Sequence, residues 1–296
     1  MNQAWPATGK IILGTIFACT TFLPAQTSVA APETSSERTP ARLLPEADLR
    51  YADYADLVLN ASVVAVVQIV KAQRLKGELA PGLAPDKARF LVEANVQSLF
   101  KGAGGLPGII SYIADVPLDP KGKAPNLKKQ RAILLAEKVP GRPLELRLSS
   151  PYSQLNWTQV AESRVRAILQ DVNAASIPPR VTGVGNAFYV PGAIPGESEA
   201  QIFLTTADNR PISLSILRRP GEQPQWAVAL GEMVDDSAKM PQRDTLLWYR
   251  LACFLPSTLP DKSVAALAPG DSQAVRRDYR FVMEQLGACE RVIKRP

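Results

Sequence analysis

Four acidic side chains in the second half of the chain are candidates for catalysis. Glu197 and Glu199 flank Ser198 beside a Pro-Gly turn. Asp235 and Asp236 follow further along the chain. Two carboxylates that face each other across a cleft can act as general acid and general base on a glycosidic bond. These four residues therefore support an alternative hypothesis of a carboxylate-dependent hydrolase acting on envelope or extracellular glycans.

Weaker binding candidates lie between these two acidic pairs. Arg218 and Arg219 end a strand-like segment, and Trp226 follows shortly after them. If the hairpins stack in order, these residues and the carboxylates could line one edge and form a carboxylate and guanidinium site, which would suit a sugar or a divalent cation. The competing interpretation is that these are strand-end charges that are solvated and loosely paired. The sequence leaves both interpretations open.

The chain contains no histidine, and this absence excludes whole classes of active site. Ser-His-Asp and Cys-His catalysis both need an imidazole base. Histidine-dependent zinc sites and facial-triad iron sites need an imidazole ligand. Carboxylate chemistry, a Ser-Lys pair and a hard cation held by oxygen ligands remain possible without histidine. In the leading interpretation, a non-catalytic exported binding protein, we expect no catalytic residues, no metal site and no cofactor.

The first thirty residues have the organisation of a signal peptide. Lys10 precedes an apolar run over residues 11–23, and small residues follow before Ala30 and Ala31. About 13 residues at about 1.5 Å each extend over roughly 20 Å, which is shorter than a hydrocarbon core of about 30 Å. The sequence predicts cleavage at Ala30 or Ala31, a Sec-type route and a periplasmic or secreted protein without a transmembrane span.

Cysteine placement agrees with export. Cys19 lies within the apolar run, so Cys253 and Cys289 are the two cysteines of the mature chain. One pair of cysteines in an exported protein is typical of one disulfide. The wide spacing is unlike a redox-active Cys-x-x-Cys pair. We expect a structural bridge between the two cysteines.

Charge gives little support to nucleic-acid binding. There are 34 lysines and arginines against 28 acidic residues, a formal net charge of +6 that is spread along the chain. Nucleic-acid binding requires a dense basic face. Residues 121–131 hold a basic cluster in a Pro/Gly/Asn-rich connection, and this cluster leaves a third alternative of contact with an acidic membrane surface.

The hydrophobic pattern predicts an α+β protein in two units. Residues 31–45 form a polar, disordered leader, and residues 46–155 contain a short helix and five strand-like segments, which indicate a small β-barrel. A linking helix within residues 156–180 has Asn156 as its expected N-cap. The five predicted strands are residues 62–75, 88–100, 108–116, 131–139 and 144–149.

The second unit, residues 181–296, is expected to contain a mainly antiparallel sheet followed by two helices. The helices are predicted at residues 241–254, with Pro241 in the first turn, and at residues 272–287. They carry the two cysteines near their C-terminal ends, so a bridge would join them as a helical hairpin. The four predicted strands are residues 181–190, 201–206, 212–217 and 225–230.

The first unit resembles the OB-type barrel of netrin and metalloprotease-inhibitor modules. The resemblance rests on ADLV at 55–58, FLVE at 90–93 and LFKG at 99–102. It implies a five-stranded barrel. Those inhibitors present an N-terminal cysteine to the metal, whereas this stretch contains none, so the resemblance implies no protease inhibition.

Three segments of the second unit also resemble a family of exported proteins from sphingomonad-type bacteria. The segments are TGVGNAF at 182–188, RRPG to WAVALGE within 218–232, and DTLLWYRLAC at 244–253. The resemblance implies export and brings neither an activity nor site residues. The expected partner is an envelope protein or a glycan of unknown identity.

Overall fold

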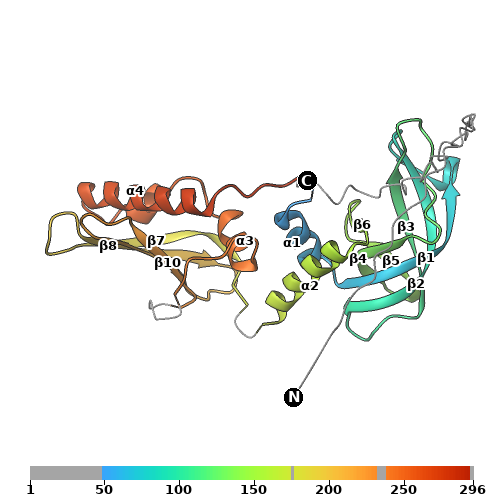
Figure 1. Cartoon of the computed structure of the whole chain (residues 1–296), viewed down its shortest axis with the longest axis horizontal. Coiled ribbons are helices and arrows are strands. Elements are labelled where there is room, and N and C mark those ends of the chain that lie inside the picture. Colours follow the sequence, from blue (N-terminus) through green and yellow to red (C-terminus); the bar gives the residue numbers. More distant parts are fainter. Residues whose placement is uncertain (1–48, 175–176, 232–237, 294–296) are drawn as a thin grey trace, which may run out of the picture. The chain divides into compact units, whose positions relative to one another are not determined.

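The computed structural model describes residues 49–174, 177–231 and 238–293. Its fold is α+β, with a closed β-barrel first, then an antiparallel sheet and C-terminal helices (Figure 1), which confirms the predicted fold class. The expected cleavage site at Ala30 or Ala31 and the leader at 31–45 lie outside the described residues. Asp235 and Asp236 also lie outside them.

Five strands form the barrel in the order β1-β2-β3-β5-β4, and pairing of β1 with β4 closes it. The β3–β5 pairing is parallel and the others are antiparallel, which is the strand arrangement of an OB-type barrel. The short strand β6 extends the sheet beyond β4, and a 3-10 turn, Gly77–Leu79, follows β1. The strands are β1 (Val63–Leu75), β2 (Lys87–Lys101), β3 (Ile109–Pro117), β4 (Arg131–Val139), β5 (Arg142–Leu148) and β6 (Gln154–Asn156).

Burial explains the different sequence patterns of the barrel strands. The first part of β1 is continuously apolar because both of its faces are covered. Ala65 packs in the cluster inside the barrel, while Val64 and Val66 belong to the cluster that includes residues of α1 and α2. Strand β3 instead alternates, with Tyr112 inside and Ile113 exposed. Alternation therefore marks the strands with one free face.

Two helices belong to the barrel region, α1 (Tyr51–Asn60) and α2 (Gln159–Asn173). The expected cap of α2 was wrong, because Asn156 is the last residue of β6 and pairs with Ala132. Thr158 caps the helix instead, and its hydroxyl accepts a 3.1 Å hydrogen bond from the backbone N–H of Ala161.

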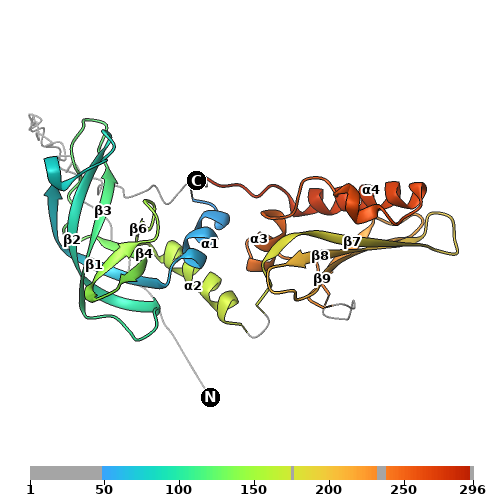
Figure 2. The ribbon, with the colours of Figure 1, turned by 180° about the vertical axis from the view of Figure 1, so that it is seen from behind.

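The second sheet has the order β10-β9-β8-β7, and all its pairings are antiparallel. Helix α4 lies along one face of it in both views (Figure 1 and Figure 2). Register shifts in β7 occur around Gly183 and Gly185, so this Gly-Val-Gly segment is a bulged strand. The strands are β7 (Val181–Pro191), β8 (Ser198–Thr206), β9 (Ile212–Arg218) and β10 (Gln225–Ala229).

The last helices are α3 (Leu246–Ala252) and α4 (Pro269–Leu286), with a 3-10 turn, Asp261–Val264, between them. The prediction that Pro241 opens a helix was wrong, since Thr245 caps α3 by accepting from the N–H of Trp248. A disulfide joins Cys253, at the C-cap of α3, to Cys289, beyond the end of α4.

Candidate functional site

A groove of about 880 Å³ runs over the outer face of the barrel strands β1, β2, β3 and β5. Its floor is built from side chains that alternate with the buried ones on β2 and β3. Leu91 lies directly opposite Ile113 in the antiparallel register, so the two form an aliphatic row. These side chains stay 42% and 52% exposed, which leaves apolar area available to a partner.

Two further cross-strand pairs flank this aliphatic row on the groove floor. Arg89 lies opposite Asp115 on one side, and Glu93 lies opposite Ser111 on the other. Lys71 on β1 lies beside Glu93 in the β1–β2 register. The floor therefore presents an ion pair, an aliphatic pair and a polar pair in successive rows, about 6.6 Å apart along each strand.

The Arg89–Asp115 pair is bidentate and well anchored. Arg89 Nε and Nη2 donate to the two carboxylate oxygens of Asp115 at 2.7 and 2.8 Å, and Nη1 donates to the carbonyl of Pro81 at 2.9 Å. The hydrogen bond from Arg89 lowers the pKa of the Asp115 carboxyl below its ordinary value. The pair is thus a fixed polar boundary of the groove, with both charges compensated.

The charges of the groove lining do not favour a polyanion. Arg147 donates to Glu137 at 2.6 Å, so a second arginine is also paired. The lining holds no exposed aromatic ring for base stacking, since Tyr112 is 2% exposed. Three cations, Lys71, Arg89 and Arg147, face four carboxylates, Glu93, Asp115, Glu137 and Glu145.

The structure places two of the four predicted carboxylates, and these two do not line one pocket. Glu197 lines a small pocket of about 350 Å³ at the loop before β8, and it is the sole carboxylate among the described residues that line it. Glu199 is exposed on β8 and does not line this pocket. Asp235 and Asp236 lie outside the described residues, so a pair of Glu197 or Glu199 with either of them stays a prediction.

The three predicted binding residues, Arg218, Arg219 and Trp226, lie in different surroundings. Arg218 lines the pocket of Glu197, and its Nε donates at 2.5 Å to Asp278, whose side chain is fully buried on α4. Arg219 lies 4.0 Å from Glu222 at the surface. Trp226 is buried in the core of the second sheet. Arg218 therefore fastens a helix to the sheet, while Arg219 and Trp226 belong to no shared site.

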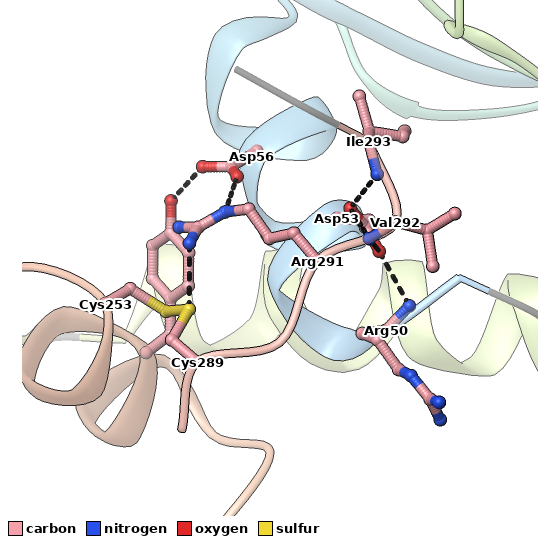
Figure 3. A network of polar contacts seen from close by, with 9 residues as sticks. Arg50, Asp53, Asp56, Cys253, Cys289, Arg291, Val292 and Ile293 are labelled. Atoms are coloured by element: carbon pink, nitrogen blue, oxygen red, sulfur yellow. Dashed lines mark hydrogen bonds and ion pairs between the residues drawn. A yellow bond between two sulfur atoms is a disulfide. The ribbon is translucent and has the colours of Figure 1, made fainter. Parts of the chain in front are cut away.

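A polar network that the sequence did not reveal fastens the C-terminal segment to α1 (Figure 3). Asp53 is buried and accepts backbone hydrogen bonds from Arg50, Val292 and Ile293 at 2.8 to 3.2 Å. Its position in the first turn of α1 indicated only a helix cap, because the partners at 292 and 293 lie at the other end of the chain.

Asp56 extends this network one turn further along α1. It accepts from the hydroxyl of Tyr249 and, at 2.7 Å, from Nε of Arg291 (Figure 3). Nη1 of Arg291 also lies 2.9 Å from Sγ of Cys289. The disulfide and the two carboxylates thus hold one segment, residues 287–293, and we call this set of contacts the C-terminal clasp.

Neither a metal site nor a membrane helix is found in the described parts of the chain. No group of three or more Asp, Glu or Cys side chains there is placed to hold a metal ion. Over the same residues, none of the helices combines the length and the apolar character needed to cross a membrane.

The loop between β3 and β4, which carries the predicted basic cluster, is held by hydrogen bonds within the loop itself. Asp119 accepts from the backbone N–H groups of Lys121 and Lys123, which closes the loop locally. Arg131 stacks on the ring of Trp157 at 3.4 Å from its centroid. This arginine therefore contributes to packing.

Neither a protein-family model nor a curated protein matches this chain.

Proposed function

We propose that this chain is an exported, non-catalytic binding protein of the Gram-negative envelope that docks an extended polypeptide segment in the barrel groove. The observation that carries the proposal is the groove floor, where the exposed Leu91–Ile113 row lies between the Arg89–Asp115 ion pair and the Glu93–Ser111 pair. Export is supported by the disulfide between Cys253 and Cys289, since such bonds persist in oxidising compartments.

The chemistry of the lining favours a polypeptide over other ligands. A nucleic acid would need a cationic excess and stacking rings, and the lining has three cations against four carboxylates. A glycan bound by stacking would likewise need exposed aromatic rings. A polypeptide in extended form repeats its side chains every second residue, which matches the spacing of the floor rows along β2 and β3. The expected partner segment therefore carries an aliphatic residue between charged ones of both signs.

Selection of peptides on the intact mature protein tests this proposal. A random peptide library is panned on the unmodified chain, and the affinity of an enriched peptide is measured by calorimetry for the unmodified chain and two variants. Ile113→Glu places a charge in the aliphatic row. Val160→Glu is the matched control, because Val160 is 59% exposed on α2 and lies outside the groove.

We expect Ile113→Glu to weaken peptide binding by about tenfold or more, because a hot-spot apolar contact is replaced by a buried charge. Val160→Glu should bind as the unmodified chain does. Equal binding by all three proteins, with unchanged circular dichroism, would overturn the proposal. So would a selection that enriches no peptide.

A further inference from the structure

A second cavity lies among α1, the segment 149–153 and α3, with a volume of about 750 Å³. This volume falls within the range of small-molecule sites, about 300–1,000 Å³. Its apolar wall is formed by side chains from three parts of the chain: Leu57, Leu59, Phe254 and Ile293. Ile293 belongs to the C-terminal clasp, so the clasp forms part of this wall.

The two carboxylates that line the cavity are already compensated by the C-terminal clasp. Asp53 accepts from three backbone N–H groups, and Asp56 accepts from Tyr249 and from Arg291. Each therefore has donors from the protein itself. An incoming ligand would find their negative charge largely satisfied.

Two arginines in the same lining lack such compensation. Arg180 and Arg250 both line the cavity, and neither forms an ion pair with a carboxylate of the described residues. Nε of Arg250 is buried without a hydrogen-bond partner among the groups that the structure describes. A buried donor of this kind costs about 1–3 kcal/mol until something accepts from it.

The electrostatic surroundings of Arg250 also favour a bound anion. Burial lowers the pKa of its guanidinium, and the positive charge of Arg180 adds to that lowering, although Tyr249 and Asp208 act against it. Ser149 Oγ, in the same lining, is also buried without a partner among the described residues. Two like charges near each other, with unused hydrogen-bonding groups beside them, are the features of an anion site.

We propose that this cavity binds an anionic amphiphile, a molecule with one acidic head group on an apolar body. Arg180 and Arg250 would hold the head group, and Leu57, Leu59 and Phe254 would pack against the body. The shared chemistry is that of a fatty carboxylate or an alkyl phosphate. The cavity adjoins the barrel groove, because both linings contain Ser149, Ser150 and Pro151. Arg180, Arg250 and the apolar wall belong to the cavity lining, whereas Leu91 and Ile113 belong to the groove lining.

The probe for the test is 8-anilinonaphthalene-1-sulfonate, whose fluorescence rises when its apolar rings leave water. It is titrated into the intact, oxidised mature protein and into two variants. Arg250→Gln removes one of the cavity cations. Arg219→Gln is the matched control, because Arg219 is a surface arginine that pairs with Glu222 and does not line the cavity.

We expect Arg250→Gln to weaken binding of the probe by about tenfold, as for the loss of one charge-assisted hydrogen bond, with no change in Arg219→Gln. Ile113→Glu should also bind the probe normally, which separates failure of this site from failure of the groove. Equal binding by Arg250→Gln and the unmodified protein would overturn the proposal.

Displacement of the probe from the unmodified protein needs no variant and so does not depend on how a variant folds. Octanoate and octyl phosphate are compared with octanol, which has the same chain without the charge. The acids should displace the probe at about tenfold lower concentration than octanol, and their order distinguishes carboxylate from phosphate as the preferred head group. Displacement by octanol at the same concentration as the acids would contradict an anion site.

Discussion

The barrel and the sheet that follows it differ in whether their strands leave a free edge. In the barrel, β1 pairs with β2 and β4, so the five strands close without a free edge. In the second sheet, β7 and β10 are edge strands, and α4 covers one face. The barrel contains no cysteine, whereas the helices after the sheet are joined by a disulfide. The barrel, which hydrogen bonds close, thus has no covalent cross-link. The open sheet is followed by helices that a disulfide cross-links.

This contrast also separates the two proposed sites. The barrel groove is a property of a closed, self-supporting sheet, and its floor residues follow directly from strand alternation. The cavity near α1 depends on a C-terminal segment that the disulfide and two aspartates hold in place. We therefore expect changes to the C-terminal clasp to affect the cavity and to leave the groove intact.

The largest effect is expected inside the barrel. Leu134 is fully buried on β4, opposite Ala65 in the pairing that closes the barrel. Leu134→Ala should lower the free energy of unfolding by about 2–5 kcal/mol, because it leaves a cavity in a packed core. Urea unfolding measures the change. Leu144→Ala, at an exposed position of β5, is the control and should stay within about 1 kcal/mol of the unmodified protein.

Removing the disulfide should have the next largest effect, confined to the second region. Cys253→Ser together with Cys289→Ser should lower stability by about 2–4 kcal/mol, as for other disulfides that close loops of this length. Hydrogen exchange should quicken in α3 and α4, while the amides of β1 to β4 keep their protection. An equal loss of protection in the barrel strands would show that the stability of the barrel depends on the disulfide.

Loss of one aspartate of the C-terminal clasp should have a smaller effect. Asp53→Ala leaves the N–H groups of Val292 and Ile293 without their acceptor. The free energy of unfolding should fall by about 1–3 kcal/mol as a result. Exchange of these two amides, followed by NMR, should become faster. Asp261→Ala, which removes an exposed pair with Arg276, serves as the comparison and should cost about 1 kcal/mol or less.

The smallest effect concerns pH and the groove. Because hydrogen bonding to Arg89 lowers the pKa of Asp115 in the folded state, the stabilisation is present above the unfolded pKa of about 3.9. It is lost as pH falls through the lower folded value. As the pH falls, the melting temperature of Asp115→Asn should therefore decrease less than that of the unmodified protein. Melting curves between about pH 2 and pH 6 measure it, and an unchanged acid limb would show that the ion pair adds no stability.

Local sequence patterns were sufficient to predict the barrel strands, because the burial pattern of each strand is visible in its own residues. The alternating β3 and the doubly buried β1 were both recognisable as strands. The parallel β3–β5 pairing could not be inferred from any one segment, because register between distant strands depends on tertiary packing. The three-residue strand β6 was missed, and this error displaced the predicted cap of α2 from Thr158 to Asn156.

The candidate sites were harder to predict than the fold. Glu197 and Glu199 are close in sequence, yet Glu199 does not line the pocket of Glu197. The roles of Asp53 and Asp56 depend on residues more than 190 positions away, so no local spacing could reveal them. The groove could not be located from the sequence, because its aliphatic row depends on the β2–β3 register.

The most direct test of the central claim, that the barrel groove docks a polypeptide, is methyl NMR of the intact mature protein during titration with a selected peptide. If the groove docks the peptide, the methyl signals of Leu91 and Ile113 shift and saturate together, while those of Val160 stay unchanged. Unchanged signals of Leu91 and Ile113 with the peptide bound would show that the peptide docks elsewhere.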